Sequence, residues 1–155
     1  MRLREVIRTG KSDIVIGRWG TGHIPAAQFP LRDRPTTFKL GPTWRWAVIR
    51  FRALGQSFRV LLLLNVSREI FRAVLAAEVG KEFRMICVHE FHAREPGWHC
   101  HMVDVLDSAP QGWRRRGMRR FPKGARIDAV FDVTEITAVR IAQRLFRIDA
   151  PGDLL

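Results

Sequence analysis

The stretch FRMICVHEFHAREPGWHCHMVDVL, residues 83–106, has the pattern of a β-hairpin. Residues 83–93 and 98–106 are rich in the aromatic, β-branched and other apolar residues that are typical of strands. Between them, Arg-Glu-Pro-Gly at 94–97 carries the residues of a turn. The sequence therefore predicts two neighbouring antiparallel strands at its centre.

Further elements extend outward from this hairpin. Residues 44–51 are expected to form a strand, and the continuous apolar run 58–64 suits a strand buried on both faces. Ser67 is expected to cap a helix whose apolar residues recur at helical spacing until Gly80. Towards the C-terminus, the sequence predicts a strand over 126–133 and a helix from Thr134 to Arg147.

The order of these elements predicts an α+β domain over residues 44–150, an antiparallel sheet with helices on one face, similar in layout to ferredoxin or RRM folds. Residues 14–16 could add a short strand, but residues 1–43 hold many glycines and prolines and are expected to form an irregular N-terminal arm. Residues 151–155 are expected to be a C-terminal tail. GRWGTG at 17–22 superficially resembles a phosphate-cradling loop, but it lacks the Lys-Ser/Thr pair and the strand–loop–helix frame of one.

Composition restricts the compartment and the class of partner. The longest apolar run, 60–64, is far below the roughly 20 residues that span a bilayer. Two cysteines cannot form a disulfide framework, so a cytoplasmic protein with no membrane partner is expected. The chain has 27 basic and 15 acidic residues, a net charge of +12, which favours an anionic partner such as nucleic acid.

The positive charge is densest over residues 111–126, where no acidic residue occurs. Guanidinium groups grip phosphates as bidentate donors, and aromatic faces stack on unpaired bases. The alternative is a solvated loop that keeps a basic protein soluble. The candidate nucleic-acid-binding residues are Trp113, Arg114, Arg115, Arg116, Arg119, Arg120, Lys123 and Arg126.

Four of the five histidines fall within the hairpin. Side chains alternate along strands, so the loop length decides which of them meet. A four-residue loop over 94–97 pairs His92 with His99 and Glu90 with His101, and a two-residue loop over 96–97 keeps the same parity. Both place Glu90, His92, His99 and His101 on one face, whereas a loop of three or five residues would bring His89 there instead.

Imidazole and carboxylate side chains in this arrangement predict a divalent metal site formed by those four residues. Zinc, manganese, iron, nickel or copper suit it, whereas magnesium usually takes fewer histidines, and the identity of the metal (Mn, Zn or Mg) stays open. The alternative is a set of half-buried polar residues on a solvated sheet face. Cys87 and Cys100 point to the opposite face in this register and are expected to be core residues.

The segment WHCHMV, residues 98–103, resembles the His-hydrophobe-His motif of the HUH endonuclease superfamily, with Cys100 at the hydrophobe position. Glu90, nine residues before His99, matches the third metal ligand of many members. The resemblance implies a metal-binding protein of the replication-initiator or relaxase type, carried by plasmids, phages or other mobile elements. It also implies single-stranded or hairpin DNA as the partner.

In that superfamily a helix tyrosine attacks the scissile phosphate, but this chain contains no tyrosine. The resemblance therefore implies either a relative that binds DNA without nicking it or a phosphodiesterase that uses metal-bound water. In the second case His92 is either the general base or a fourth ligand. Two other classes stay open: a small RNA- or DNA-binding module without metal, and a basic protein that docks on an acidic partner.

Overall fold

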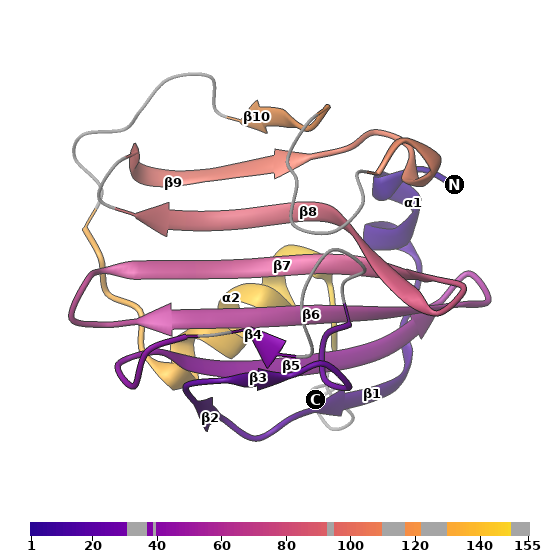
Figure 1. The fold of residues 1–155 in the computed structure, drawn as a ribbon. Coiled ribbons are helices and arrows are strands. Elements are labelled where there is room, and N and C mark those ends of the chain that lie inside the picture. The colour runs from indigo at the N-terminus through magenta and orange to yellow at the C-terminus, as the bar shows by residue number, and fades with distance from the viewer. Residues whose placement is uncertain (31–36, 39, 93–94, 110–116, 122–129, 150–155) are drawn as a thin grey trace.

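The computed structural model describes residues 1–30, 37–38, 40–92, 95–109, 117–121 and 130–149. An eight-stranded sheet dominates it, in the order β1-β5-β6-β7-β8-β9-β10, with β2 also paired to β5 (Figure 1). Every pairing in this sheet is antiparallel, so the predicted α+β fold class with an antiparallel sheet is confirmed. The strands are β1 (Ser12–Ile16), β2 (Gly20–Thr21), β5 (Arg45–Ala53), β6 (Gln56–Asn65), β7 (Ile70–Val79), β8 (Glu82–His92), β9 (Glu95–Met102) and β10 (Arg119–Phe121).

Two helices pack on one face of this sheet, as the fold-class prediction requires. They are α1 (Leu3–Arg8) and α2 (Glu135–Phe146), and α2 lies behind the sheet in Figure 1. Leu3 and Val6 of α1 and Ala142 and Phe146 of α2 belong to one buried cluster with residues from β5, β6 and β7. A single turn of 3₁₀ helix, η1 (Leu106–Ser108), follows the strand β9 after a short connection.

The opposite face of the sheet has a smaller core of its own. Ile24 and Phe29 are fully buried there against Leu61, Val74 and other residues of the central strands. The two-stranded sheet β3 (Ile24–Pro25) and β4 (Thr37–Phe38) lies on this side, in front of the main sheet in Figure 1. Strands β6 and β7 are therefore buried on both faces over much of their length, as predicted for residues 58–64.

The predicted helix after Ser67 is wrong, because residues 70–79 form strand β7 between β6 and β8. A strand that is buried on both faces shows no clean alternation of apolar and polar residues, so its apolar run can imitate helical spacing. The Ser67 hydroxyl donates to Asn65 Oδ1 (2.9 Å) within the β6–β7 turn and caps no helix. Gly80, with φ at 64°, lies in the β7–β8 turn.

The prediction of an irregular arm over residues 1–43 needs correction where this segment is described. It contains helix α1, and strands β1 and β2 both pair with β5 of the main sheet. The two-residue strands β3 and β4 also lie in it. The short strand expected at residues 14–16 is present within β1.

The C-terminal prediction is confirmed for the helix only. Thr134 Oγ1 accepts from the Thr137 backbone N–H (3.2 Å) at the start of α2, and Arg147, with φ at 51°, follows its end. Residues 130–133 are not in a strand, and residues 126–129 of the expected strand lie outside the described residues. The expected tail, 151–155, also lies outside them.

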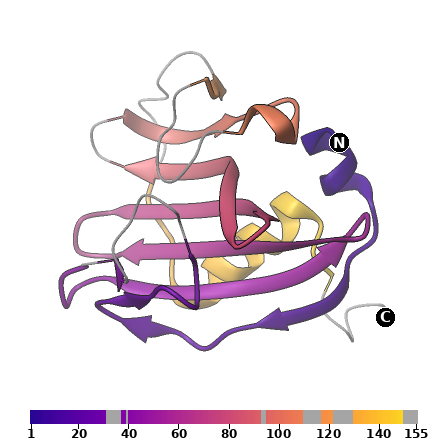
Figure 2. The same cartoon turned by 45° about the vertical axis from the view of Figure 1, so that its right-hand side comes forward.

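The N-terminal segment reaches from the chain just after β9 to the opposite edge of the sheet. Arg2 forms a β-bridge with Val105, just after β9, and the Leu3 N–H donates to the Asp104 carbonyl (3.1 Å). The chain then passes along the ends of the strands and enters β1, which pairs with β5 at the other edge (Figures 1 and 2). Residues 1–16 therefore contact the sheet at its β1–β5 edge and near the end of β9.

Candidate metal centre

The register of β8 and β9 decides which hairpin side chains meet. Glu90 pairs with His99 and Val88 with His101, two residues away from the predicted register but with the same parity. The predicted four-residue loop is wrong, because Glu95 already pairs with His92 and a bulge separates that pair from Glu90. Since parity is preserved, the predicted gathering of Glu90, His92, His99 and His101 on one face is confirmed.

This face is the one that carries the smaller core. Val74 and Val88 belong to that core and pair with each other, and two residues along the same strands Arg72 pairs with Glu90. His89 projects to the opposite face, where its ring stacks on Trp98 at 5.1 Å between centroids. Burial, and secondly the neighbouring His99, lower the pKa of His89 to about 4. His89 is therefore a neutral packing residue outside the cluster.

Three imidazoles converge on one carboxylate oxygen. Oε1 of Glu90 lies 3.1 Å from Nε2 of His99, 3.3 Å from Nε2 of His101 and 3.5 Å from Nε2 of His92. The ligand atoms of Glu90, His99 and His101 all lie within 4.8 Å of one another. These three residues form a cluster that could hold a metal ion, and His92 is the fourth member of the predicted set.

The cluster is shielded from solvent to different degrees. The side chains of Glu90 and His99 are 0% and 1% exposed, whereas those of His92 and His101 are 13% and 14% exposed. His92 and His101 therefore form the more accessible side of the cluster.

Neighbouring groups orient two of the side chains. The Nδ1–H of His99 donates to the Gly97 carbonyl (3.1 Å), because a carbonyl oxygen can only accept. That bond leaves the lone pair of the neutral ring on Nε2, the nitrogen that faces Glu90. The other carboxylate oxygen, Oε2 of Glu90, accepts from Arg72 Nε at 3.0 Å. Oε1 is thus the atom left to meet the imidazoles.

Arg72 is a member of the site that the sequence analysis missed. It is brought to Glu90 because β7 pairs with β8, and a helix over the same residues would have placed it elsewhere. The available signal was Arg72 itself, the one arginine in a largely apolar run. In a strand that is buried on both faces, such an arginine indicates a buried acidic partner.

The candidate nucleic-acid-binding residues are described only in part. Arg120 lies opposite His101 in the β9–β10 ladder, and Arg119 is paired with Asp104 and sits over Phe121 at 5.4 Å. These two residues therefore lie on the strand that borders the cluster. The others, Trp113, Arg114, Arg115, Arg116, Lys123 and Arg126, lie outside the described residues.

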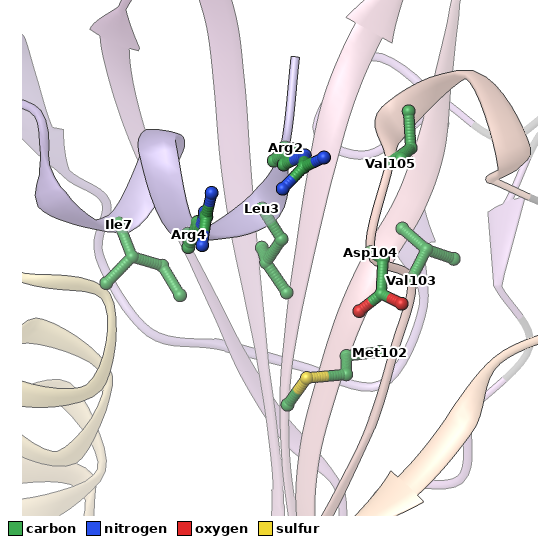
Figure 3. Close-up of a pocket in the computed structure, with 8 residues that line it drawn as sticks. All are labelled: Arg2, Leu3, Arg4, Ile7, Met102, Val103, Asp104 and Val105. Atoms are coloured by element: carbon green, nitrogen blue, oxygen red, sulfur yellow. The ribbon is translucent and has the colours of Figure 1, made fainter.

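A cavity of about 550 Å³ lies apart from the histidines, between α1 and the chain that leaves β9 (Figure 3). Its walls include Leu3 and Val103, which belong to the core on the helix-covered face. Cys87 is buried in that same core, and Cys100 packs against it, as predicted for both cysteines. The cavity and the cluster are thus on opposite faces of the sheet.

Within the described residues, neither helix has the length and apolar character needed to cross a membrane. Comparison of the chain with protein-family models, with curated proteins and with solved structures finds no match.

Proposed function

We propose that the chain binds one divalent transition-metal ion through Glu90, His99 and His101, with His92 as the fourth ligand. The observation that supports this proposal is the convergence of three Nε2 atoms on Oε1 of Glu90 at 3.1–3.5 Å. In a tetrahedral site with metal–nitrogen distances near 2.0–2.1 Å, neighbouring ligand atoms are about 3.3–3.4 Å apart. The three distances from Oε1 match that spacing, and the ligand atoms of Glu90, His99 and His101 all lie within 4.8 Å of one another.

Hydrogen bonding alone explains the cluster less well. One carboxylate oxygen offers about two lone pairs, fewer than the three imidazoles around it. In addition, if the Nδ1–H of His99 donates to Gly97, a neutral ring directs its Nε2 lone pair at the carboxylate 3.1 Å away, and only an imidazolium would donate to both groups. A bound cation would remove both difficulties, because each ligand would direct a lone pair at the ion.

The ligand chemistry favours zinc or manganese over magnesium, since three imidazoles with one carboxylate suit borderline transition metals. Nε2 of His92 lies 3.5 Å from Glu90 Oε1, on the same side of the sheet as the other ligands and within reach of the same ion. Of the two roles considered for His92, we therefore propose the fourth ligand.

We propose a nucleic acid as the partner of this metal-binding face. The net charge of +12 favours a polyanion. Arg119 and Arg120 stand on the strand next to His101, and the arginine-rich segment 111–126 includes that strand. Backbone phosphates would then lie beside the accessible side of the cluster. This is the partner expected from the HUH resemblance, which stays a prediction.

The metal proposal is tested by metal analysis of purified protein. We expect near-stoichiometric metal in the wild type and its loss in the His99→Ala, His101→Ala double variant, with the far-UV circular dichroism unchanged. His23→Ala is the matched control, because His23 is exposed and distant in sequence from the hairpin. Equal metal content in the double variant and the control would rule out the site.

The nucleic-acid proposal is tested by the salt dependence of binding to a labelled single-stranded oligonucleotide. Replacing Arg114, Arg115 and Arg116 with alanine should flatten the log–log slope by up to ~2–3, since each phosphate contact contributes ~0.7–0.9. An unchanged slope would mean that these arginines only face solvent.

Activity is tested on the same oligonucleotide with Mn²⁺ or with excess EDTA. Because the chain has no tyrosine, no phosphotyrosyl adduct is expected. Metal-dependent cutting with free ends would identify a phosphodiesterase. Metal-independent binding without cutting would identify a binding protein. A covalent protein–DNA adduct stable to denaturant would contradict both the phosphodiesterase and the binding protein.

A further inference from the structure

We infer a second ligand site, for a phosphate oxyanion, on the far side of the same sheet face, where β5 meets β1 and the segment before Pro30. Its positive walls are Arg18 and Arg50, with the Arg59 guanidinium on the neighbouring strand. This site does not depend on the metal centre: it is built on β5 and β6, whereas the histidines are on β8 and β9.

The first observation is a pair of like charges in direct opposition. Arg50 and Arg59 face each other across β5 and β6. Like charges at directly opposed positions of an antiparallel pair are unfavourable. Among the described residues, neither guanidinium has a carboxylate within 4.0 Å, although other arginines of the sheet do, such as Arg72 with Glu90.

Neutral acceptors hold both guanidiniums in place. Arg50 Nη2 donates to Gln28 Oε1 at 2.9 Å. Arg59 Nη1 donates to the Ala27 carbonyl at 2.6 Å and to the Gln28 carbonyl, and its guanidinium lies 4.6 Å above the Phe83 ring. Burial, and after it the charge of Arg50, lower the pKa of Arg59, while Glu78 acts in the opposite direction. The two cations are thus fixed side by side by neutral acceptors; Asp13 and Glu78 line a neighbouring cavity with them, but among the described residues neither carboxylate forms an ion pair with Arg50 or Arg59.

The second observation is a cavity of about 260 Å³ against Arg50. The polar residues that line it are Arg18, Gln28 and Arg50, and Trp46 and Val48 contribute its apolar wall. Nε1 of Trp46 is buried and has no hydrogen-bond acceptor among the described residues. Two guanidiniums and the amide of Gln28 therefore line this cavity, and its lining includes no carboxylate.

Close backbone packing shapes this cavity. A Cβ at Gly17 would lie 2.7 Å from the Val48 carbonyl oxygen, and a Cβ at Gly20 would lie 2.7 Å from two ring carbons of Trp46. Both glycines belong to GRWGTG, residues 17–22. This segment resembles a phosphate-cradling loop but lacks the strand–loop–helix frame of one. The glycines let this segment lie directly on β5, with Arg18 between them.

The chemistry of the walls selects an oxyanion. Guanidinium groups present parallel N–H donors that match phosphate oxygens, and the amide of Gln28 can add a neutral donor. The volume is larger than an inorganic phosphate needs and leaves room for part of an attached group. The phosphate could therefore belong to a small phosphorylated molecule or to a nucleic-acid backbone, and the experiment separates these sources.

The test compares thermal unfolding in millimolar inorganic phosphate with that in chloride of equal ionic strength. We expect phosphate to raise the Tm of the wild type but not of Arg50→Gln or Arg18→Gln. Arg68→Gln, an exposed arginine in the β6–β7 turn, is the matched control and should respond like the wild type. No phosphate effect on the wild type would overturn the proposal.

The basal Tm separates a binding role from a structural one. In chloride, Arg50→Gln should unfold at the same or a higher temperature than the wild type, because the repulsion with Arg59 is removed. If Arg50 only anchors Gln28, the variant should instead unfold at a lower temperature and still respond to phosphate, which would overturn the proposal.

The indole N–H of Trp46 gives an independent readout. Its ¹H–¹⁵N cross-peak, assigned by its loss in Trp46→Phe, should shift during titration with inorganic phosphate. A short single-stranded oligonucleotide that shifts the same peak and competes with phosphate would identify a backbone phosphate. Phosphate binding without such competition would identify a small phosphorylated ligand, and an unmoved cross-peak with both probes would contradict the site.

Discussion

Glu90 is a carboxylate with no exposed surface, and such a group is unfavourable unless it is paired. Its two oxygens have different partners: Arg72 holds Oε2, and the imidazoles surround Oε1. The hydrogen bond from Arg72 to Oε2 directs Oε1 toward the imidazoles. Glu90 is thus the residue on which both the apo fold and the proposed metal site depend.

Replacing Glu90 with glutamine should destabilise the metal-free protein by roughly 1–3 kcal/mol, because Arg72 loses a charged acceptor and the new amide donors meet buried imidazoles. Urea unfolding in excess EDTA measures this difference. Glu78→Gln, a change to an exposed carboxylate on the neighbouring strand β7, should have an effect near zero. Equal stability of the two variants would show that Glu90 needs no partner in the folded state.

Cys87 should resist alkylation in the folded protein. Its side chain is buried in the core, and burial raises the pKa of the Cys87 thiol far above its usual range, so almost no thiolate forms at pH 8. Mass analysis after iodoacetamide treatment should find the partly exposed Cys100 modified first and Cys87 modified only in urea. Labelling of Cys87 before Cys100 would place it outside the core.

The four predicted ligands could be identified from the sequence because their common face depends only on parity. Every hairpin loop with an even number of residues brings Glu90, His92, His99 and His101 to one face. A register error of two residues therefore leaves the same four residues together. Their order around Oε1 could not be predicted, since it depends on the bulge between Glu90 and His92. No pattern of residue types signals that bulge.

Among the elements, the β5–β6 hairpin has a turn that its sequence suits poorly. Ala53 pairs with Gln56, so Leu54 and Gly55 form a two-residue turn in which both have positive φ, 52° and 73°. This geometry favours Asn-Gly, and Leu54 is a branched residue, 44% exposed, in the left-handed region. The hairpin therefore holds a residue in an unfavourable backbone conformation whose side chain is exposed.

Leu54→Asn should stabilise the protein by about 0.5–1 kcal/mol, because asparagine adopts the left-handed conformation more readily than leucine. The midpoint of urea unfolding should rise while the slope of the transition is unchanged. Leu54→Val, which keeps an apolar side chain and adds β-branching, should lower the midpoint. A fall with asparagine would mean that the Leu54 side chain makes a contact that matters.

Strand β7 is the element that sequence reasoning could not place. Phe71, Ala73 and Leu75 face one core while Val74 and Ala76 face the other, so apolar residues occupy nearly every position. Such a run contains apolar pairs three and four residues apart and fits a helix as well as a strand. Ser67 and Gly80, which lie in the turns on either side of β7, also fit the start and end signals of a helix.

At the scale of the whole molecule, one misread element changes the topology. With a helix after residue 66 the chain would form a crossover, whereas the observed strand makes β5 to β9 a run of consecutive antiparallel neighbours. The fold class survives this error, because an antiparallel sheet with helices on one face describes both arrangements. The resemblance of residues 98–103 to a known motif rests on the hairpin alone, since the strand–helix–hairpin order around it is absent.

Metal binding should stabilise the entire fold, because the ligands sit on two neighbouring strands that the unfolded chain does not hold together. A metal concentration 100 times the Kd contributes about 2.7 kcal/mol. For a domain of this size, roughly 2–4 °C per kcal/mol then gives a rise in Tm of about 5–10 °C. Differential scanning calorimetry with Zn²⁺ or Mn²⁺ measures this rise.

The His99→Ala, His101→Ala variant should show no rise in Tm with either metal. EDTA should lower the Tm of the wild type but not that of this double variant. A rise of equal size in both proteins would assign the stabilisation to unspecific binding of the ion elsewhere. His23→Ala again serves as the control that should behave as the wild type does.

The bridge between Arg2 and Val105 has a consequence for the order of events during synthesis. A ribosome releases residues 1–16 long before residues 102–106, so α1 has no docking site while the first hairpins form. The hairpins β5–β6 and β6–β7 can pair as they emerge, because each strand meets its neighbour in sequence. Residues 1–16 are therefore secured only after residues 102–106 have emerged, and until then the apolar side of α1 stays open to chaperones.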